Sequence, residues 1–297
     1  MINYLLGIDA GGTKTDFVLT DRQFTIIKKC TLGSANPVDV GIEQMLYILR
    51  EGIEYCCDGI SPDEISCFAG IAGGITGGYK EIIHSFLSQF GFGSFCNGSD
   101  IDNCIAMTLE ANDGVCVIMG TGVVAFCQHK HELHRIGGWG YLLDKGGSGY
   151  NIGADALYCA LGCYDGRGGS LLIKKLIEKK LHKTIPDAIP EIYIGGKTKI
   201  ASFAPIVFDA YKQQDDYAES ILDRNVKEVA DLIKTAYKIA KTEDLPAYIC
   251  GGLAHEKDIL HPFFKKYLTH DNLHFTTARP VNGALLKALA IAETENE

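Results

Sequence analysis

One pattern occurs twice in this chain and limits the folds that it can adopt: an apolar run, a glycine-threonine turn and a second apolar run. The first copy is Leu6-Gly7-Ile8-Asp9-Ala10-Gly11-Gly12-Thr13-Lys14-Thr15-Asp16-Phe17-Val18-Leu19, and the second extends from Gly114 to Cys127 around Gly120-Thr121-Gly122. We interpret both as β-hairpins whose glycine turns let backbone N–H groups converge on anionic oxygens with no Cβ in the way. Two such hairpins suit one nucleotide triphosphate held between two lobes. Asp9, at the end of the first strand, is predicted to hold Mg²⁺ through its water shell.

Each hairpin taken alone is also compatible with an ordinary tight turn, because short glycine motifs often arise by chance. Gly120-x-Gly122-x-x-Ala125 matches part of a dinucleotide-binding fingerprint, but a β-rich run follows where that fingerprint requires a helix. Gly196-Lys197-Thr198 is not a P-loop, because Glu191 occupies the position of the required first glycine. We predict a polar turn there, before a helix that starts near Ile200.

The length and composition are typical of a two-domain soluble enzyme. A chain of 297 residues is long enough for about two domains, each with its own core. Charged residues make up 22% of the chain and apolar residues 46%, which excludes a disordered protein. The net charge of −9 argues against a nucleic-acid surface. A bound phosphate would therefore depend on backbone dipoles, Mg²⁺ and a few local cations.

Hydropathy and cysteine usage indicate a cytoplasmic protein. No apolar run approaches the ~18 residues of a membrane helix, and the N-terminus lacks the basic start and cleavage pattern of a signal peptide. The eleven cysteines are odd in number and form no CxxC pairs. Such usage favours buried free thiols in a reducing compartment over a disulfide framework.

Hydrophobic periodicity predicts an alternation of strands and helices, and hence a mixed sheet in each half of the chain. The pattern restarts near Val115, so the domain boundary is predicted at residues 108–114, where Asn112-Asp113-Gly114 is a turn. Strands are expected near 3–9, 16–20, 24–31, 65–71, 93–98, 115–119, 122–128, 132–136 and 247–250. Helices are expected near 38–57, 78–90, 100–111, 148–163, 169–182, 200–213 and 216–242, and from Gly283 onward.

Several glycine-rich motifs, in the same order along the chain, resemble those of the BadF/BadG/BcrA/BcrD-type ATPases, which belong to the actin, sugar-kinase and Hsp70 superfamily. The resemblance covers essentially the whole chain, and within the family it is greatest to the N-acetylglucosamine kinases. The motifs that carry it are Asp9 to Thr15, Gly120-Thr121-Gly122, Gly137-Gly138-Trp139-Gly140, Gly147-Ser148-Gly149-Tyr150 and Gly251-Gly252.

The resemblance implies an α/β fold of two ribonuclease-H-like, actin-like ATPase lobes with a nucleotide cleft between them. The N-terminal lobe would comprise residues 1–110, the C-terminal lobe residues 111–283, and a helix over 284–297 would pack back on the first lobe. The implied cofactors are ATP and Mg²⁺, with Asp9 as the metal-binding residue and Gly251 and Gly252 on the adenosine side. The implied phosphate-binding residues are Gly11, Gly12, Thr13, Lys14, Thr15, Gly120, Thr121 and Gly122.

Phosphoryl transfer to a sugar hydroxyl needs a base beside the attacking oxygen, and Asp100 is our candidate for that catalytic residue. It follows a short apolar strand and begins a helix, where kinases of this family carry their general base. Two structural interpretations stay open. Asp is a favoured N-cap, which alone would explain Asp100. Asp102 is a competing carboxylate in the first helical turn, where it would complement the helix dipole.

The resemblance also implies the sugar-binding residues, with Asp100 among them. Asn36 matches a position that binds sugar hydroxyls, although an Asn-Pro turn would also explain it. Trp139, the only tryptophan, matches a position that lines the pocket beside Gly138, although a lone aromatic residue is often simply part of the core.

The loop after the tryptophan departs from the family pattern, which is Gly-Asp-Glu-Gly-Ser. Here Lys145 takes the place of the Asp and Gly146 that of the Glu, while Asp144 stands one residue early. Losing a charged partner for sugar hydroxyls, about 1.5–3 kcal/mol, would alter specificity. Lys145 would instead suit an acidic substituent, such as the lactyl carboxylate of N-acetylmuramic acid.

Two clusters of metal-ligand residue types are open to other interpretations. His129, His131 and His134 lie around a predicted hairpin tip, where solvated side chains are more common than a zinc site. Cys159 and Cys163 are four residues apart on a predicted helix. Related activator ATPases hold an iron–sulfur cluster with two such cysteines per subunit, but core packing also explains buried cysteines.

The leading prediction is therefore an ATP-dependent kinase of an amino sugar: N-acetylglucosamine, glucosamine or N-acetylmuramic acid, at the 6-hydroxyl. One alternative is an ATPase that activates a CoA-ester reductase or dehydratase, and another is a sugar or nucleotide sensor with altered catalysis. The expected partner is a small-molecule sugar, with no nucleic acid and no membrane. The sequence leaves the oligomeric state open, a homodimer included.

Overall fold

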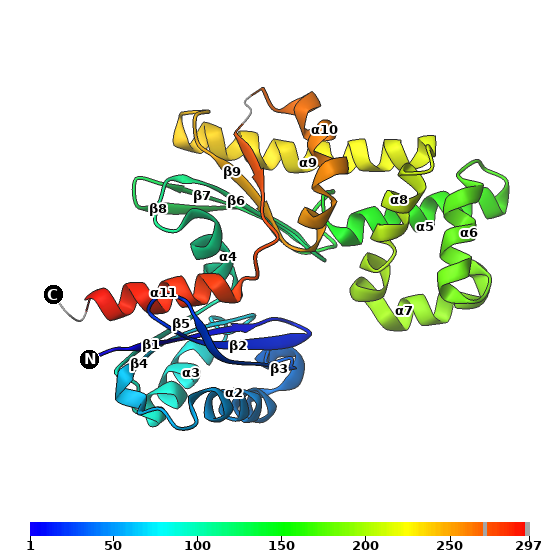
Figure 1. Ribbon diagram of the computed structural model, residues 1–297. Coiled ribbons are helices and arrows are strands. Elements are labelled where there is room, and N and C mark those ends of the chain that lie inside the picture. Colours follow the sequence, from blue (N-terminus) through cyan, green and yellow to red (C-terminus); the bar gives the residue numbers. More distant parts are fainter. Residues whose placement is uncertain (270–271, 295–297) are drawn as a thin grey trace. The chain divides into compact units, whose positions relative to one another are not determined.

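The computed structural model describes residues 1–269 and 272–294, which form two compact units, each built on a five-stranded mixed sheet (Figure 1). Unit 1 comprises Met1–Ala111 together with the segment that starts at Ala278. Unit 2 comprises Asn112–Thr277.

Unit 1 has the strand order β3-β2-β1-β4-β5. Strands β3, β2 and β1 form an antiparallel meander, and β1, β4 and β5 run parallel to one another. Its strands are β1 Tyr4–Ala10, β2 Lys14–Asp21, β3 Ile26–Gly33, β4 Ile65–Ile71 and β5 Ser94–Gly98. Its helices are α1 Pro37–Val40, α2 Ile42–Cys57, α3 Tyr79–Leu87, α4 Asp100–Leu109 and α11 Val281–Thr294, with short 3₁₀ turns at Pro62–Glu64 and Ser88–Phe90.

Helices cover both faces of the unit 1 sheet, which explains why its central strands are almost entirely apolar. Leu6 and Ile8 point to one face, where they pack with buried side chains of α2 and α3. Leu5 points to the other face, where it packs with Val281 and Leu285 of α11. In Figure 1, α2 and α3 accordingly lie on one side of the strands and α4 and α11 on the other.

Unit 2 has the order β10-β9-β6-β7-β8, with an antiparallel β6-β7-β8 meander and parallel β6, β9 and β10. Its strands are β6 Gly114–Met119, β7 Val123–His129, β8 Glu132–Gly137, β9 Ala247–Cys250 and β10 Leu273–Phe275. Its helices are α5 Gly149–Asp165, α6 Leu171–Leu181, α7 Ile185–Ala201, α8 Ala204–Tyr211, α9 Asp216–Ala240 and α10 Lys257–Tyr267, with a 3₁₀ turn at Gly252–Glu256.

The two sheets share one topology. Read from the meander edge, unit 1 is β3-β2-β1-β4-β5 and unit 2 is β8-β7-β6-β9-β10, so each unit begins with a hairpin and then adds two parallel strands. The repeated pattern of the sequence is therefore a repeat of structure, with the glycine turns at equivalent places between β1 and β2 and between β6 and β7.

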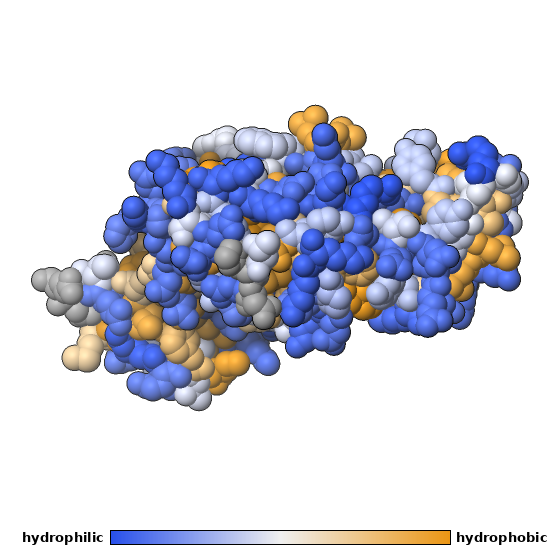
Figure 2. Space-filling model, turned by 90° about the horizontal axis from the view of Figure 1, so that it is seen from above, coloured by the Kyte–Doolittle hydropathy of each residue, from blue (hydrophilic) through white to orange (hydrophobic). Residues whose placement is uncertain are grey.

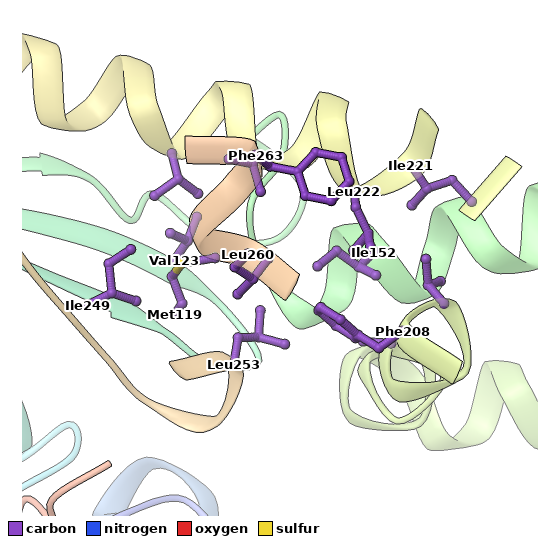
Figure 3. Close-up of a cluster of buried hydrophobic side chains, with 14 of the residues drawn as sticks. Met119, Val123, Ile152, Phe208, Ile221, Leu222, Ile249, Leu253, Leu260 and Phe263 are labelled. Atoms are coloured by element: carbon purple, nitrogen blue, oxygen red, sulfur yellow. The ribbon is translucent and has the colours of Figure 1, made fainter. Parts of the chain in front are cut away.

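A second hydrophobic core fills unit 2 between its sheet and its helices (Figure 3). Phe263 of α10 lies against Leu222 of α9, and both side chains are buried. Met119 and Val123 extend this core to the ends of the second hairpin. Hydrophilic side chains cover most of the face seen in Figure 2, where hydrophobic ones form separate patches.

Most expected elements are present within a few residues of their predicted limits, but α7, α10 and β10 were not predicted. The turn predicted at Gly196-Lys197-Thr198 is present only as a break between two helical segments within the bounds of α7. The helix does kink there, since Gly196 has a φ of 52°. Pro186 near the start of α7 and Pro190 within it read as helix breakers, although proline is tolerated in a first turn. Among the described helices, none combines the length and apolarity needed to cross a bilayer.

Candidate functional site

Asp9 and Asp100 lie at the same edge of the unit 1 sheet. Asp9 is near the carboxyl end of β1, and Asp100 follows β5 and begins α4. Because β1, β4 and β5 are parallel, their carboxyl ends meet at one edge, where ligands of open α/β sheets usually bind.

The Asp9 carboxylate is largely withdrawn from solvent and has one strong amide partner. Asn103 Nδ2 donates to Asp9 Oδ1 over 2.8 Å. Burial raises the pKa of Asp9 to about 6, and the neighbouring Asp100 carboxylate adds to the rise, while the Asn103 hydrogen bond lowers it. An added cation would offset the burial. Mg²⁺ prefers such hard oxygen ligands and needs only one or two carboxylates besides water and substrate phosphates, so this residue fits it.

Asp100 is not the N-cap of α4. Ser99 caps the helix, and Asp102 completes a capping box by accepting a hydrogen bond from the Ser99 backbone N–H over 2.8 Å. Ser99 thus serves as the N-cap, and Asp102 supplies a carboxylate in the first helical turn, so neither structural role depends on Asp100. Burial raises the pKa of Asp100, although the backbone N–H groups of Ile101 and of Asp100 itself lower it in part.

The glycine turn between β1 and β2 is closed by a hydrogen bond from the Gly11 backbone N–H to the Lys14 carbonyl, over 2.9 Å. Gly12 and Thr13 are exposed at its tip, and a Cβ at Gly12 would meet only the Asp39 carboxylate, at 3.7 Å. Thr15 is buried, and its hydroxyl donates to the Gly33 carbonyl over 2.8 Å. The tip of the turn is therefore its accessible part.

Lys14 and Arg279 converge on a second carboxylate, Asp16, which is only 3% exposed. Lys14 Nζ lies 3.0 Å and Arg279 Nη2 lies 2.5 Å from Asp16 Oδ2. Burial alone would raise the pKa of Asp16, but hydrogen bonds from Thr31, Arg279 and Lys14 outweigh it and lower the pKa. Lys14 is thus ion-paired, although more than half of its side chain remains exposed.

Asn36 is the N-cap of α1. Its Oδ1 accepts from the Val38 backbone N–H over 3.1 Å, and its Nδ2 donates to Asp39 Oδ2 over 2.6 Å. The Asn-Pro turn expected as the alternative is therefore formed. A role of Asn36 in sugar binding stays a prediction.

In unit 2, the turn Gly120-Thr121-Gly122 is held against the start of α5. The Gly149 backbone N–H donates to the Gly120 carbonyl over 2.8 Å, and the Tyr150 N–H donates to the Thr121 carbonyl over 3.1 Å. A Cβ at Gly120 or Gly122 would meet nothing within 4 Å, and neither residue has a positive φ. The fold itself therefore does not require glycine here, whereas close approach of a ligand would.

Gly251 and Gly252 differ in this respect. Gly251 has a φ of 92°, and a Cβ would lie 2.6 Å from the Met119 carbonyl oxygen at the end of β6. Gly252 has open space around it. Gly251 is thus required by the junction of β6 and β9, and Gly252 is the member of the pair that a ligand can approach.

Trp139 is not part of the core, because 66% of it is exposed. The Arg135 guanidinium lies 4.7 Å from the centre of its ring, a cation–π contact that supports one side of the indole. Gly138 has a φ of 73°, and its Cβ would collide with Val124. Tyr141, farther along the loop, packs on Tyr150 with ring centres 4.8 Å apart.

The Asp144 carboxylate closes the loop that carries Trp139. Its two oxygens accept from the backbone N–H groups of Trp139 and Gly140, over 3.2 and 2.9 Å. Lys145 is exposed and has no ion-pair partner among residues 1–269 and 272–294. The loop thus carries both an exposed indole, at Trp139, and an exposed cation without an ion-pair partner in the described part of the chain, at Lys145.

Two of the three histidines of the β7–β8 hairpin, His129 and His134, lie against neighbouring carboxylates. His129 Nδ1 lies 2.8 Å from Asp113 Oδ2, and His134 Nε2 lies 3.2 Å from Glu132 Oε2. No set of three or more His, Cys, Asp or Glu side chains in the described part of the chain is arranged to hold a metal. Cys159 Sγ accepts a hydrogen bond from the Ser170 backbone N–H and packs against the unit 2 core.

Sequence reasoning missed two residues that surround the predicted phosphate hairpin. Asn103 carries a usable signal, because it lies one helical turn after Asp100 and therefore on the same face of α4. Arg279 carries none, since only the return of the chain to unit 1 brings it to Asp16.

Comparison with known proteins assigns a family to the chain. The family model described as the BadF/BadG/BcrA/BcrD ATPase family matches residues 6–288. The N-acetylmuramic acid/N-acetylglucosamine kinase of Clostridium acetobutylicum is 27% identical over 99% of this chain and 99% of that protein. The N-acetyl-D-glucosamine kinase of Dictyostelium discoideum is 28% identical over 96% of this chain and 97% of that protein.

A solved structure shares the fold. A candidate N-acetylglucosamine kinase from Chromobacterium violaceum superposes with a TM-score of 0.77 at 21% identity, covering 97% of this chain and 99% of that one. The predicted α/β fold of the actin-like ATPase type is confirmed.

Proposed function

The chain belongs to the BadF/BadG/BcrA/BcrD ATPase family, and we propose that it transfers the γ-phosphoryl group of ATP to a hydroxyl group of an amino sugar. The observation that carries this proposal is the state of Asp100. It is a carboxylate with a raised pKa at the edge of the unit 1 sheet where the carboxyl ends of the parallel strands meet, and Ser99 and Asp102 cap its helix.

In this proposal Asp100 accepts the proton of the sugar hydroxyl as that oxygen attacks the γ-phosphorus, and the bond from this phosphorus to the β–γ bridging oxygen breaks to release ADP. A base helps when its pKa is closer to the working pH than that of a free carboxylate, and burial moves Asp100 in that direction. The backbone N–H groups of the two glycine turns, with Lys14, would hold the phosphate oxygens. Asp9 would hold Mg²⁺, which neutralises the charge that develops on the phosphate oxygens.

The acceptor is proposed to be an N-acetylated hexosamine, in line with the substrates in the names of the two relatives. Trp139 offers an exposed aromatic face for the sugar ring. Asp144 is occupied with its own loop, so it supplies no obvious replacement for the family carboxylate. The unpaired Lys145 favours an acceptor with an acidic substituent, such as N-acetylmuramic acid.

We place the activity in a reducing compartment such as the cytoplasm, where ATP is available. The cysteines are odd in number and form no CxxC pairs, which is typical of proteins kept in such an environment.

The test is ATP consumption with N-acetylglucosamine, glucosamine, N-acetylmuramic acid and no sugar. We expect turnover that depends on an amino sugar and falls ~10²-fold or more in Asp100→Asn. Asp102→Asn is the matched control: it weakens the capping box by ~1 kcal/mol and should leave kcat nearly unchanged.

Sugar-independent ATP hydrolysis would instead support the activator class, and nucleotide binding without turnover would support a sensor. If Asp100→Asn turns over at the wild-type rate while sugar binding is intact, Asp100 is not the base. Equal relative rates on the three sugars in wild type and in Lys145→Gln would remove the role of Lys145.

A further inference from the structure

We propose that Asn103 is a positioning residue that fixes the Asp9 carboxylate and ties it to the helix that carries Asp100. The inference rests on the proposed function for the roles of Asp9 and Asp100. The contacts of Asn103 are independent of that function.

Asn103 is fully buried and makes two hydrogen bonds to the end of β1. Its Nδ2 donates to Asp9 Oδ1 over 2.8 Å and to the Ile8 carbonyl over 3.3 Å. Exchanging the amide nitrogen and oxygen would place an oxygen against both a carboxylate and a carbonyl. Only the observed orientation is attractive, so the side chain sets the direction of one Asp9 oxygen.

The other end of the Asn103 amide has no stabilising role. Its Oδ1 is buried and has no hydrogen-bond partner within residues 1–269 and 272–294. Buried polar atoms are almost always paired, and exceptions concentrate at functional sites. A leucine of similar shape would avoid this unpaired oxygen. Asparagine at this position is therefore better explained by what Nδ2 does to Asp9 than by stability.

Two glycines of neighbouring elements, Gly70 and Gly283, lie directly against Asn103. A Cβ at Gly70 of β4 would overlap the Asn103 amide, and a Cβ at Gly283 of α11 would overlap the Asn103 carbonyl. The two glycines let α4 pack tightly between the sheet and α11. The backbone of Asn103 is thereby packed closely on both sides, so its position is fixed by the sheet and α11 and not by the Asp9 side chain.

Asp100 and Asn103 are three residues apart on α4 and so share one helix face. The hydrogen bond to Asp9 thus joins the proposed metal-binding carboxylate and the proposed base through a single helical turn. Residues that orient metal-binding side chains in this way usually contribute about 10–100-fold to metal affinity or activity.

The decisive variant is Asn103→Leu, which keeps the shape of the side chain and removes the donor. Its matched control is Thr108→Val, a buried polar-to-apolar change on the same helix, where the hydroxyl contacts only α4 carbonyls. For each protein, calorimetry would measure the affinity for AMP-PNP with and without Mg²⁺, and thermal unfolding would be followed without ligand.

We expect Asn103→Leu to lose about 10-fold or more of the gain in AMP-PNP affinity that Mg²⁺ provides, while its metal-free affinity stays at the wild-type value. The melting temperature of this variant falls, because the Asp9 carboxylate and the Ile8 carbonyl lose their donor, so the Mg²⁺-dependent gain is the deciding quantity. Thr108→Val should keep the full Mg²⁺-dependent gain. A merely structural asparagine would lower the melting temperature and leave the Mg²⁺-dependent gain unchanged.

The inference is overturned if Asn103→Leu shows the wild-type Mg²⁺-dependent gain, or if Thr108→Val loses as much of it. Should Asn103→Leu not fold, Asn103→Ala removes the same donor with less bulk, and the same ratio decides. No sugar enters this measurement. Absence of sugar phosphorylation would therefore defeat the proposed function without touching the role of Asn103.

Discussion

Two buried carboxylates of the first hairpin have opposite pKa shifts, and the difference lies in their partners. Asp16 receives hydrogen bonds from two cationic side chains and a hydroxyl, which lower its pKa despite burial. Asp9 receives one neutral amide hydrogen bond and faces another carboxylate, so burial dominates and its pKa rises to about 6. Asp16 is thus ion-paired with two cations, whereas no cationic side chain in the described part of the chain forms a hydrogen bond or ion pair with Asp9.

This contrast predicts that Asp9→Asn stabilises the ligand-free protein at neutral pH while it abolishes Mg²⁺-dependent turnover. The folded-state pKa of about 6 lies above the ordinary 3.8, so stability from Asp9 is present below pH 3.8 and is lost as pH rises through 6. The loss amounts to up to about 3 kcal/mol. Asparagine does not titrate and suffers no such loss.

Denaturant unfolding without Mg²⁺ or nucleotide would measure the stability difference between Asp9→Asn and wild type at pH 7.5 and at pH 4. We expect a clear gain at pH 7.5 that shrinks toward zero at pH 4. A difference that is the same at both pH values would show that the Asp9 carboxylate is not strained by burial.

At the scale of elements, the glycine turns divide into those that the fold requires and those that it does not. Gly251 has a left-handed backbone and abuts β6, while Gly120, Gly122 and Gly252 have empty space where a side chain would project. Close approach of another molecule to the backbone is one use of a glycine that the fold does not itself require.

The adjacent pair Gly251 and Gly252 allows a direct test of this division. Gly251→Ala should lower the free energy of unfolding by more than ~1–2 kcal/mol, because the left-handed backbone and the Met119 carbonyl both oppose a Cβ. Gly252→Ala should change stability by less than ~0.5 kcal/mol and weaken ATP binding. Chemical denaturation and nucleotide titration of both variants would check this. Wild-type ATP affinity in Gly252→Ala would remove this turn from the adenosine side.

Sequence reasoning recovered the elements whose signal is local. Both hairpins show strands of apolar residues around a glycine turn, and β4 and α4 were equally clear from periodicity. The helix α7 was missed because Pro186, Pro190 and Gly196 are breakers by local rules, and only the packing of Ile185 and Ile192 into the core overrides them. Asn103 was missed because its partners Ile8 and Asp9 are distant in sequence.

At the scale of the whole molecule, the chain leaves unit 1 after Ala111 and returns to it at Ala278. The returning helix α11 buries Val281 and Leu285 against Leu5, Val18 and Phe68 on one face of the sheet. Unit 1 is therefore discontinuous in sequence, whereas unit 2 is a single stretch. Despite this difference in continuity, the sheets of the two units have the same strand order.

We predict that a chain ending at Thr277 keeps unit 2 folded and loses unit 1. Each fully buried Val or Leu contributes about 1.5–3 kcal/mol, and domains are stable by only ~5–15 kcal/mol. Limited proteolysis with mass spectrometry should find cleavage throughout residues 1–111 and protection within 112–277. Leu285→Ala in the full chain should show a milder form, a loss of ~2–5 kcal/mol. Full protection of residues 1–111 in the shortened chain would contradict the prediction.

The discontinuity of unit 1 also sets an order of events during synthesis. Domains of growing chains usually fold from the N-terminus onward. Here strand β1, which carries Asp9, and helix α4, which begins at Asp100, are made before unit 2 but wait for α11, while unit 2 is made and can fold in the interval. Although Asp9 and Asp100 precede unit 2 in the chain, they reach their final surroundings only after α11, which follows unit 2, has been made.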